Sequence, residues 1–144
     1  MSEMGIALAD RFAFIDRMIF NYLIGNADAH GKNSSVLYRG RNRRSLAPLY
    51  DVVCTCVYRN LSRVTAMSIG GAKAFDDVTR QSFETMADEV GMRPQLVLGR
   101  LDAMARRVLP VARDLAAEMG LRWPSSVYAK IVAVIERQVS ATVP

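Results

Sequence analysis

The spacing of apolar residues changes near Gly71, and this change restricts the fold more than any other feature. Between about Val36 and Gly71, apolar residues form short runs with a period of two, which are typical of strands. After it, they recur every three or four residues over long stretches, as on one face of a helix. A length of 144 residues suits one compact domain, and a hydrophobic content of 51% is enough for a buried core. We therefore predict a single, mainly helical domain over residues 1–144, with a small β-hairpin (α+β).

An amphipathic helix is predicted ahead of the strand-like region, from about Ile6 to Ile24. Gly25 is predicted to end this helix. The segment that follows, GNADAHGKN, is polar and interrupted by glycine, so we expect a loop. The apolar positions that define the helix are Phe12, Ile15, Ile19 and Leu23.

A small β-hairpin is predicted near residues 36–53. The runs Val36–Tyr38 and Leu46–Val53 are short and apolar, and the turn-forming sequence RGRN separates them. The run from Leu61 to Ile69 is compatible with one further strand. The sequence GGAK at residues 70–73 has some likeness to a phosphate-binding loop but lacks the Walker spacing, so we interpret it as a turn.

The first two helices after Gly71 are predicted from their caps and apolar faces. Asp76 or Asp77 is expected to cap a helix that runs to Gly91. Pro94 suits the first turn of the next helix, because its fixed φ angle is already helical and its missing N–H is not needed there. The expected inward residues of the first of these helices are Val78, Phe83, Met86 and Val90.

The predicted second helix contains a proline, and a third helix follows it. Pro110 is expected to kink or break the second helix, because proline removes a backbone hydrogen bond and clashes with the preceding turn. A continuation should end near Gly120. Ser125 or Ser126 is expected to cap the last helix. None of these helices gathers titratable side chains, so we expect any chemistry in the first third of the chain.

Several classes of protein are disfavoured by the sequence. The longest uncharged apolar stretch, residues 18–27, is too short to span a bilayer, and no secretory signal is visible at the N-terminus. Cys54 and Cys56 form a Cys-x-Cys pattern, but a zinc site would need more ligands than one histidine can add. We interpret these cysteines as two small apolar side chains and expect a cytoplasmic protein with reduced thiols.

Basic residues are densest at Arg39, Arg41, Arg43 and Arg44, in a chain of net charge +5. Such a cluster attracts phosphates, so nucleic acid or an acidic partner is one interpretation. The other is a solvated hairpin tip, because turn-forming residues lie between the arginines. We favour the tip, since no aromatic residues are interleaved for base stacking.

Asp28, Asn33 and Asp51 are the candidates for chemistry. Phosphoryl transfer needs a carboxylate that orients or deprotonates the attacking hydroxyl, and hard oxygen ligands that hold Mg²⁺ against the phosphates. A loop with Asp five residues before Asn, followed by a second Asp after a hairpin, supplies all three. Asp28-x-His30-x-x-Asn33 alone is equally typical of a turn in which Asp and Asn side chains cap the backbone.

The longer strings NYLIGNADAHGKNSSVLY and LAPLYDVV resemble the catalytic-loop and metal-loop segments of HipA-type kinases. These are serine/threonine kinases of bacterial toxin–antitoxin operons, with a fold related to phosphoinositide and protein kinases. The resemblance covers the helix before the loop, both motifs and their spacing, and continues more loosely through SIGG and the helical tail. It implies the C-lobe of a protein-kinase-like fold.

Carried over to this chain, the resemblance implies that Asp28 is the catalytic base and that Asn33 and Asp51 are the metal ligands. It places His30 beside the nucleotide, as in phosphoinositide kinases, where this histidine follows the catalytic Asp. The sequence Tyr-Asp-Val at residues 50–52 has no counterpart of the DFG phenylalanine. Lys32 and Tyr50 are the remaining candidates for nucleotide contact. Lys32 could equally be a solvated surface lysine, and Tyr50 could instead pack under the hairpin.

The resemblance further implies ATP and Mg²⁺ as cofactors, a helix-turn-helix antitoxin as partner, and DNA contacted only indirectly. A protein substrate is implied as well, with aminoacyl-tRNA synthetases in the family's substrate class. The sequence contains no GxGxxG loop, so we expect the nucleotide-binding lobe to be absent and the isolated chain to be inactive. The alternative is a non-enzymatic interaction module that binds nucleic acid or an antitoxin through its arginine-rich hairpin.

Overall fold

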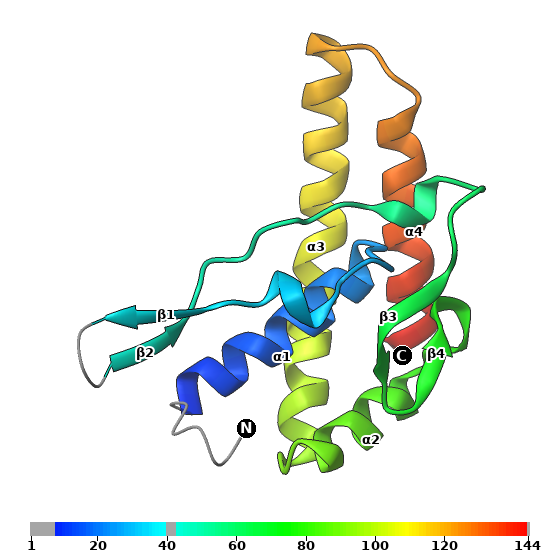
Figure 1. Ribbon diagram of the computed structural model, residues 1–144. Coiled ribbons are helices and arrows are strands. Elements are labelled where there is room, and N and C mark those ends of the chain that lie inside the picture. The colour runs from blue at the N-terminus through cyan, green and yellow to red at the C-terminus, as the bar shows by residue number, and fades with distance from the viewer. Residues whose placement is uncertain (1–7, 40–42, 144) are drawn as a thin grey trace.

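The computed structural model describes residues 8–39 and 43–143, and its core forms around the first helix. Helix α1 (Leu8–Leu23) buries Ile15, Ile19 and Leu23 almost completely, which matches the predicted apolar stripe. Figure 1 shows α1 crossing the long helix α3 (Pro94–Arg122), and α1 ends beyond this crossing, beside α4 (Val127–Thr142). The loop that follows α1 is therefore attached to the most buried part of the molecule.

Three helices form the remainder of the core. Helix α2 (Arg80–Glu89) packs against α3, and α3 packs in turn against α4 (Val127–Thr142), which runs antiparallel to it (Figure 1). Tyr22 of α1 stacks on Phe75, with ring centroids 5.1 Å apart, and meets Phe83 of α2 edge-on at 5.4 Å. Burial raises the pKa of Tyr22 to about 12. No helix in the described ranges is long and apolar enough to cross a membrane.

Two small antiparallel sheets flank the helices. Strand β1 (Val36–Arg39) pairs with β2 (Arg43–Leu46), and this hairpin projects away from the helices in Figure 1. Strand β3 (Val64–Ile69) pairs with β4 (Ala72–Ala74) through an irregular register and lies against α2. Three short 3₁₀ helices complete the elements of the described residues: η2 (Gly31–Asn33), η3 (Thr55–Val57) and η4 (Phe75–Asp77). The predicted α+β class is confirmed.

The strand predictions need two corrections. The second strand of the first hairpin is Arg43–Leu46 rather than Leu46–Val53. The backbone N–H of Ala47 still donates to Ser35 O, but Pro48 has no N–H to continue the ladder. Arg43 and Arg44 therefore lie in a strand rather than at the tip, and Arg41 falls outside the described residues. The further strand predicted within 61–69 is confirmed as β3, with GG at the turn, but its partner β4 was not predicted.

The helix predictions also need corrections. Helix α2 begins after Thr79. The Thr79 N–H donates to Ser82 Oγ, and the Thr79 side chain accepts from the Ser82 backbone N–H, so these two residues form a capping box. The predicted caps Asp76 and Asp77 were therefore wrong. Helix α3 continues through Pro110 to Arg122 and is not broken there. The predicted Ile6 start of α1 lies outside the described residues.

Candidate active site

The candidate catalytic loop, residues 24–35, begins where α1 ends. Gly25 has a φ angle of +77°, and a Cβ atom there would lie 2.4 Å from Val134 Cγ1, so both the backbone turn and the packing require glycine. The N–H of Asn26 then donates to Asn21 O at 2.8 Å. This tight exit from the helix directs residues 26–33 across the end of α1.

Asn33 and Asp51 are brought together although 18 residues separate them. Asn33 Nδ2 donates to Asp51 Oδ2 at 2.7 Å. Asp51 itself has a φ angle of +56° and is the one non-glycine residue with positive φ in the described chain. This conformation is uncommon outside glycine, and it is found disproportionately at functional sites. The Nδ2 atom of Asn26 also lies 3.4 Å from Asp51 O.

Asp28 joins this pair through its backbone and through His30. Its carbonyl oxygen lies 3.4 Å from Asn33 Nδ2. His30 Nδ1 lies 3.0 Å from the carboxylate oxygen Oδ1 of Asp28 and also 3.0 Å from its carbonyl oxygen. The Asp28 side chain is 64% exposed, so it is open to an incoming group.

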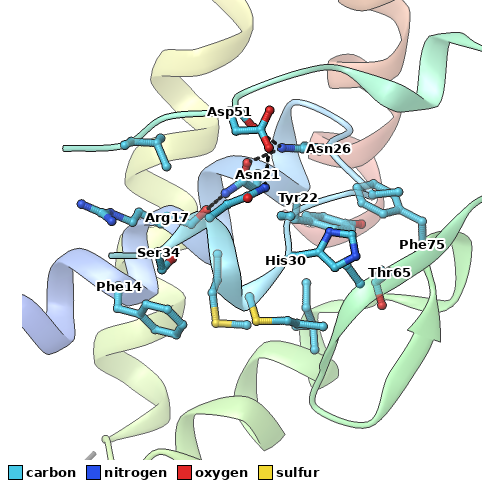
Figure 2. A pocket seen from close by; sticks show the side chains of 18 of the residues that line it. Phe14, Arg17, Asn21, Tyr22, Asn26, His30, Ser34, Asp51, Thr65 and Phe75 are labelled. Atoms are coloured by element: carbon cyan, nitrogen blue, oxygen red, sulfur yellow. Dashed lines mark hydrogen bonds between the residues drawn. The ribbon is translucent and has the colours of Figure 1, made fainter. Parts of the chain in front are cut away.

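A pocket lies between the catalytic loop, α1 and β3. Figure 2 shows Asp51 and Asn26 at one side of it, with His30 facing Thr65 and Phe75. His30, Asn33, Tyr50 and Asp51 line this pocket, whereas Asp28 and Lys32 are not among its lining residues. Asp28 is therefore beside the pocket, in contact with the His30 side chain that enters it.

Tyr50 and Lys32 are connected through the backbone. The Tyr50 hydroxyl donates to Lys32 O at 2.9 Å and lies 2.7 Å from Ser35 Oγ. Tyr50 thus lines the pocket and also ties residue 50 to the catalytic loop. The Lys32 side chain is exposed and makes no hydrogen bond or ion pair with the described part of the chain.

The pocket also contains a cation that the sequence analysis did not select. Arg17 of α1 lines the pocket, and its Nη2 atom donates to Ala47 O. Burial lowers the pKa of this guanidinium, but an arginine stays charged at neutral pH. It therefore adds a positive charge to the pocket wall.

The two cysteines lie away from this pocket, against Gly25. Both thiols are free, and burial raises the pKa of Cys54 to about 11. No group of three or more His, Cys, Asp or Glu side chains in residues 8–39 and 43–143 could hold a metal. Cys56 packs against the hydrophobic core, as expected of a small apolar side chain.

Comparison with known proteins identifies the family. Residues 2–112 match the family described as the HipA-like C-terminal domain. The chain belongs to this family. The matched segment includes the catalytic loop, both sheets and the first part of α3, so the HipA-like domain contains all the candidate residues described above.

Individual relatives of this HipA-like domain are much longer than the chain. The Sinorhizobium fredii protein Y4mE, whose name proposes a kinase, is 38% identical over 109 residues, which are 73% of this chain and 26% of that protein. The serine/threonine-protein kinase toxin HipA of Shewanella oneidensis is 31% identical over 90 residues, which are 62% of this chain and 21% of that protein. The chain thus spans about a quarter of the length of these relatives.

A solved structure has the same fold. It is the Shewanella oneidensis MR-1 toxin–antitoxin complex of HipA, HipB and operator DNA. One chain of it matches with a TM-score of 0.69 and 28% identity, and the match covers 87% of this chain and 29% of that one. The kinase-like C-terminal architecture of this HipA-like domain is therefore confirmed.

Asn26 is a residue of this HipA-like site that the sequence analysis missed. It is 4% exposed, and its side chain accepts a hydrogen bond from Asp28 N at 3.1 Å and donates to Asn21 Oδ1 at 2.8 Å. Together with the contact to Asp51 O, these bonds connect both aspartates to the end of α1. The sequence signal for Asn26 was its position directly after the glycine that ends the helix. A turn-capping role explains an asparagine there equally well.

The donor set suits Mg²⁺. Asp51 supplies a carboxylate and Asn33 an amide oxygen, which are the hard oxygen ligands that Mg²⁺ takes from proteins. Asn33 uses its Nδ2 atom to contact Asp51, so its Oδ1 atom stays available for a cation. Two protein ligands are enough for an ion that usually keeps several waters and binds substrate phosphates.

Proposed function

We propose that this chain is the catalytic-loop portion of a HipA-type serine/threonine protein kinase, which transfers the γ-phosphate of ATP to a protein hydroxyl. The observation that carries the proposal is the 2.7 Å contact between Asn33 and Asp51, made beside Asp28. A carboxylate and an amide that can bind a metal, with a second, exposed carboxylate beside them, are the groups that phosphoryl transfer requires.

Asp28 is assigned the role of base. Its exposed carboxylate can accept a hydrogen bond from the acceptor hydroxyl and orient that oxygen toward the γ-phosphate. The contact with His30 restricts the orientation of this carboxylate before the acceptor binds. Because metaphosphate-like transfer involves little covalent chemistry for the protein, positioning of the hydroxyl is the main contribution.

Asn33 and Asp51 are assigned to Mg²⁺, which would neutralise charge on the transferred phosphoryl group and the leaving phosphates. His30 and Tyr50 line the same pocket and are assigned to the nucleotide. The exposed Lys32 is assigned to the outer phosphate. The remaining nucleotide contacts are assigned to the part of a complete kinase that this chain does not include.

The partners are proposed from the relatives. The solved Shewanella structure contains HipB and operator DNA, which supports an antitoxin as the partner of the complete protein and DNA as an indirect contact. A cytoplasmic location accompanies this assignment. The protein substrate is proposed only at the level of a hydroxyl-bearing protein, with an aminoacyl-tRNA synthetase as the family-implied example.

The test uses a chimera in which this chain replaces the matching segment of the Shewanella HipA. Transfer of labelled γ-phosphate from ATP to protein is measured for the parent chimera and for Asp28→Asn and Asp51→Asn. Asp28→Asn should lower turnover by at least about 100-fold while ATP affinity stays within a few-fold, because a base acts mainly in the transition state. Asp51→Asn should also weaken Mg²⁺-dependent ATP binding, because it removes a charged ligand from the ground state.

The melting temperatures of the three chimeras serve as controls for folding. They should agree closely, because Asp28 and Asp51 are both exposed. Parent-level turnover in Asp28→Asn would remove the assigned base. A large loss of stability in both variants would favour the turn-capping role instead.

A further inference from the structure

A second hollow, here called the basic groove, lies between the segment after η3 and helix α4. Its walls carry four cationic side chains, Arg59, Arg63, Lys130 and Arg137. They come from two regions of the chain about 70 residues apart, the 57–63 segment and α4. The assigned kinase chemistry uses none of them. Like charges from separate elements around one hollow create a positive potential that attracts an anion.

The charge of the groove is only partly neutralised within the chain. Asp76 accepts a bidentate pair of hydrogen bonds from Arg63, at 2.7 and 2.6 Å, and lies 3.8 Å from Arg137 Nη2. These hydrogen bonds and charges hold the pKa of Asp76 below its usual value, so it is ionised at neutral pH. Arg59 and Lys130 are exposed and have no ion-pair partner within the described chain. One carboxylate against four cations leaves the groove strongly positive.

The groove is attached to the candidate catalytic loop. Cys56 N donates to Gly25 O at 3.0 Å, and Ala27 N donates to the Thr55 hydroxyl at 2.9 Å. On the other side of the 57–63 segment, Ala66 N donates to Ala27 O at 3.0 Å. The wall of the groove is thus held at both ends by the residues that immediately precede Asp28. In Figure 1, the chain crosses α4 just before this segment, at η3, and the segment then leads to β3.

We propose that the basic groove binds an acidic segment of the acceptor protein, next to the hydroxyl that is phosphorylated. The inference rests on the proposed kinase function and adds the substrate class: a serine or threonine flanked by Asp or Glu. A chain that presents its hydroxyl to Asp28 continues over the loop that forms the groove wall. Arg59 and Lys130 then pair with its carboxylates through charge-assisted contacts, which a neutral peptide sequence cannot make.

Nucleic acid is the competing occupant, because phosphates are attracted by the same charges. The acceptor is favoured because the groove adjoins the loop that carries the base. A stacking platform for successive bases would require several exposed rings, whereas Tyr58 is the one aromatic side chain in the groove lining. The experiment must therefore separate the two.

Direct binding to the 144-residue chain tests the inference without requiring kinase activity. The ¹⁵N-labelled chain is titrated with a peptide in which serine is flanked by glutamates, with its glutamine counterpart, and with a deoxythymidine oligomer of matched charge. Nuclear magnetic resonance detects even millimolar binding. The acidic peptide should shift the amide signals of residues 57–63 and 130–137, and its affinity should fall steeply as salt rises.

A charge-matched pair of variants locates the binding. Arg59→Glu combined with Lys130→Glu should weaken the acidic peptide at least tenfold at low salt. Arg93→Glu combined with Arg107→Glu changes the net charge equally at exposed positions outside the groove lining and should alter affinity by less than about threefold. Neither variant removes an ion pair that the described chain contains, so both should fold.

The outcomes are distinct. Equal affinity for the glutamine peptide, or equal loss in both variants, would overturn the inference. Tighter binding of the oligonucleotide that also depends on Arg59 and Lys130 would assign the groove to nucleic acid and overturn it too. Groove-dependent peptide binding in a chain whose chimera transfers no phosphate would support the groove and refute only the kinase function.

Discussion

At the scale of single residues, the site depends on a buried amide as much as on its carboxylates. Asn26 has little exposure, and its one side chain reaches the Asp28 N–H, the Asp51 carbonyl and Asn21. A buried polar group with several partners fixes the relative position of the segments it joins. Asn26 therefore acts as a positioning residue for both aspartates.

Asn26→Ala should destabilise the chain by about 1–2 kcal/mol, because it leaves the Asp28 N–H and the Asn21 side chain without this partner. Urea unfolding measures this effect. Asn60→Ala is the matched control, since Asn60 is exposed and has no side-chain hydrogen bond to the described residues. In the chimera, Asn26→Ala should lower kcat more than it raises the KM for ATP. An unchanged kcat with reduced stability would make Asn26 purely structural.

The candidate residues could be predicted at this scale, but their geometry could not. The spacing of Asp28, Asn33 and Asp51 follows from the sequence, and the structure brings Asn33 and Asp51 into contact. Asp51 has a positive φ angle and accepts contacts from residues 18 and 25 positions away, which no local pattern encodes. The place of Arg17 in the pocket could not be predicted from local sequence either, because it depends on how α1 packs beneath the loop.

At the scale of elements, long apolar stripes gave reliable predictions and short elements did not. Three turns or more of helical periodicity average out exceptions, which is why α1, α3 and α4 were found close to their predicted ranges. Strand β4 has three residues, too few to show a period. Pro110 lies inside α3 because tertiary packing over 29 residues outweighs one lost hydrogen bond, an effect that local propensity does not contain.

The turn between β3 and β4 offers a comparison within one element pair. Gly70 and Gly71 have φ angles of +52° and +82°, but only at Gly70 would a Cβ atom meet α2, at 2.0 Å from Ser82 O. Gly71→Ala should cost roughly 1–2 kcal/mol from the backbone conformation alone. Gly70→Ala should cost a further 1–3 kcal/mol or so, because the turn must move away from α2. Equal losses in urea unfolding would show that the turn does not press on α2.

An ion pair and a hydrogen bond to a backbone oxygen join α2, α3 and α4. Arg80 of α2 donates to both carboxylate oxygens of Asp102 in α3, at 2.6 and 2.9 Å, and to Thr142 O at the end of α4 at 3.1 Å. The hydrogen bonds from Arg80 hold the pKa of Asp102 below its ordinary value of 3.8. The pair therefore stabilises the fold fully above that value, and the contribution disappears as the pH falls below it.

Asp102→Asn should lower the free energy of unfolding by about 1–2 kcal/mol at pH 7, because a charge-assisted pair that is only about a quarter exposed is lost. The difference from the wild type should shrink as the pH is lowered from 5 to about 3. Glu136→Gln is the control, since its pair with Arg113 is more than half exposed and is expected to contribute less than about 0.5 kcal/mol. A pH-independent difference for Asp102→Asn would assign the effect to packing.

At the scale of the whole molecule, the chain contains one side of the proposed phosphoryl-transfer site. The candidate base, both metal-ligand candidates and the basic groove lie on the catalytic loop or on segments hydrogen-bonded to it. In the curated relatives, the residues outside the matched segment are roughly three to four times as many as those within it. The sequence of this chain contains no glycine-rich loop that could enclose the α- and β-phosphates.

The 144-residue chain alone should therefore bind ATP weakly, with a Kd above about 1 mM, even with Mg²⁺ present. Arg17 can attract the phosphates and Asp51 can attract the metal. Without a glycine-rich loop over the phosphates, however, the pocket cannot exclude water or immobilise the triphosphate. Isothermal titration of the chain and of the chimera with ATP and Mg²⁺ measures the difference. The chimera should bind at least tenfold more tightly, and Asp51→Asn should reduce that gain. A micromolar Kd for the chain alone would mean that its own residues hold most of the nucleotide, with Arg17 and Lys32 as the first candidates for phosphate ligands.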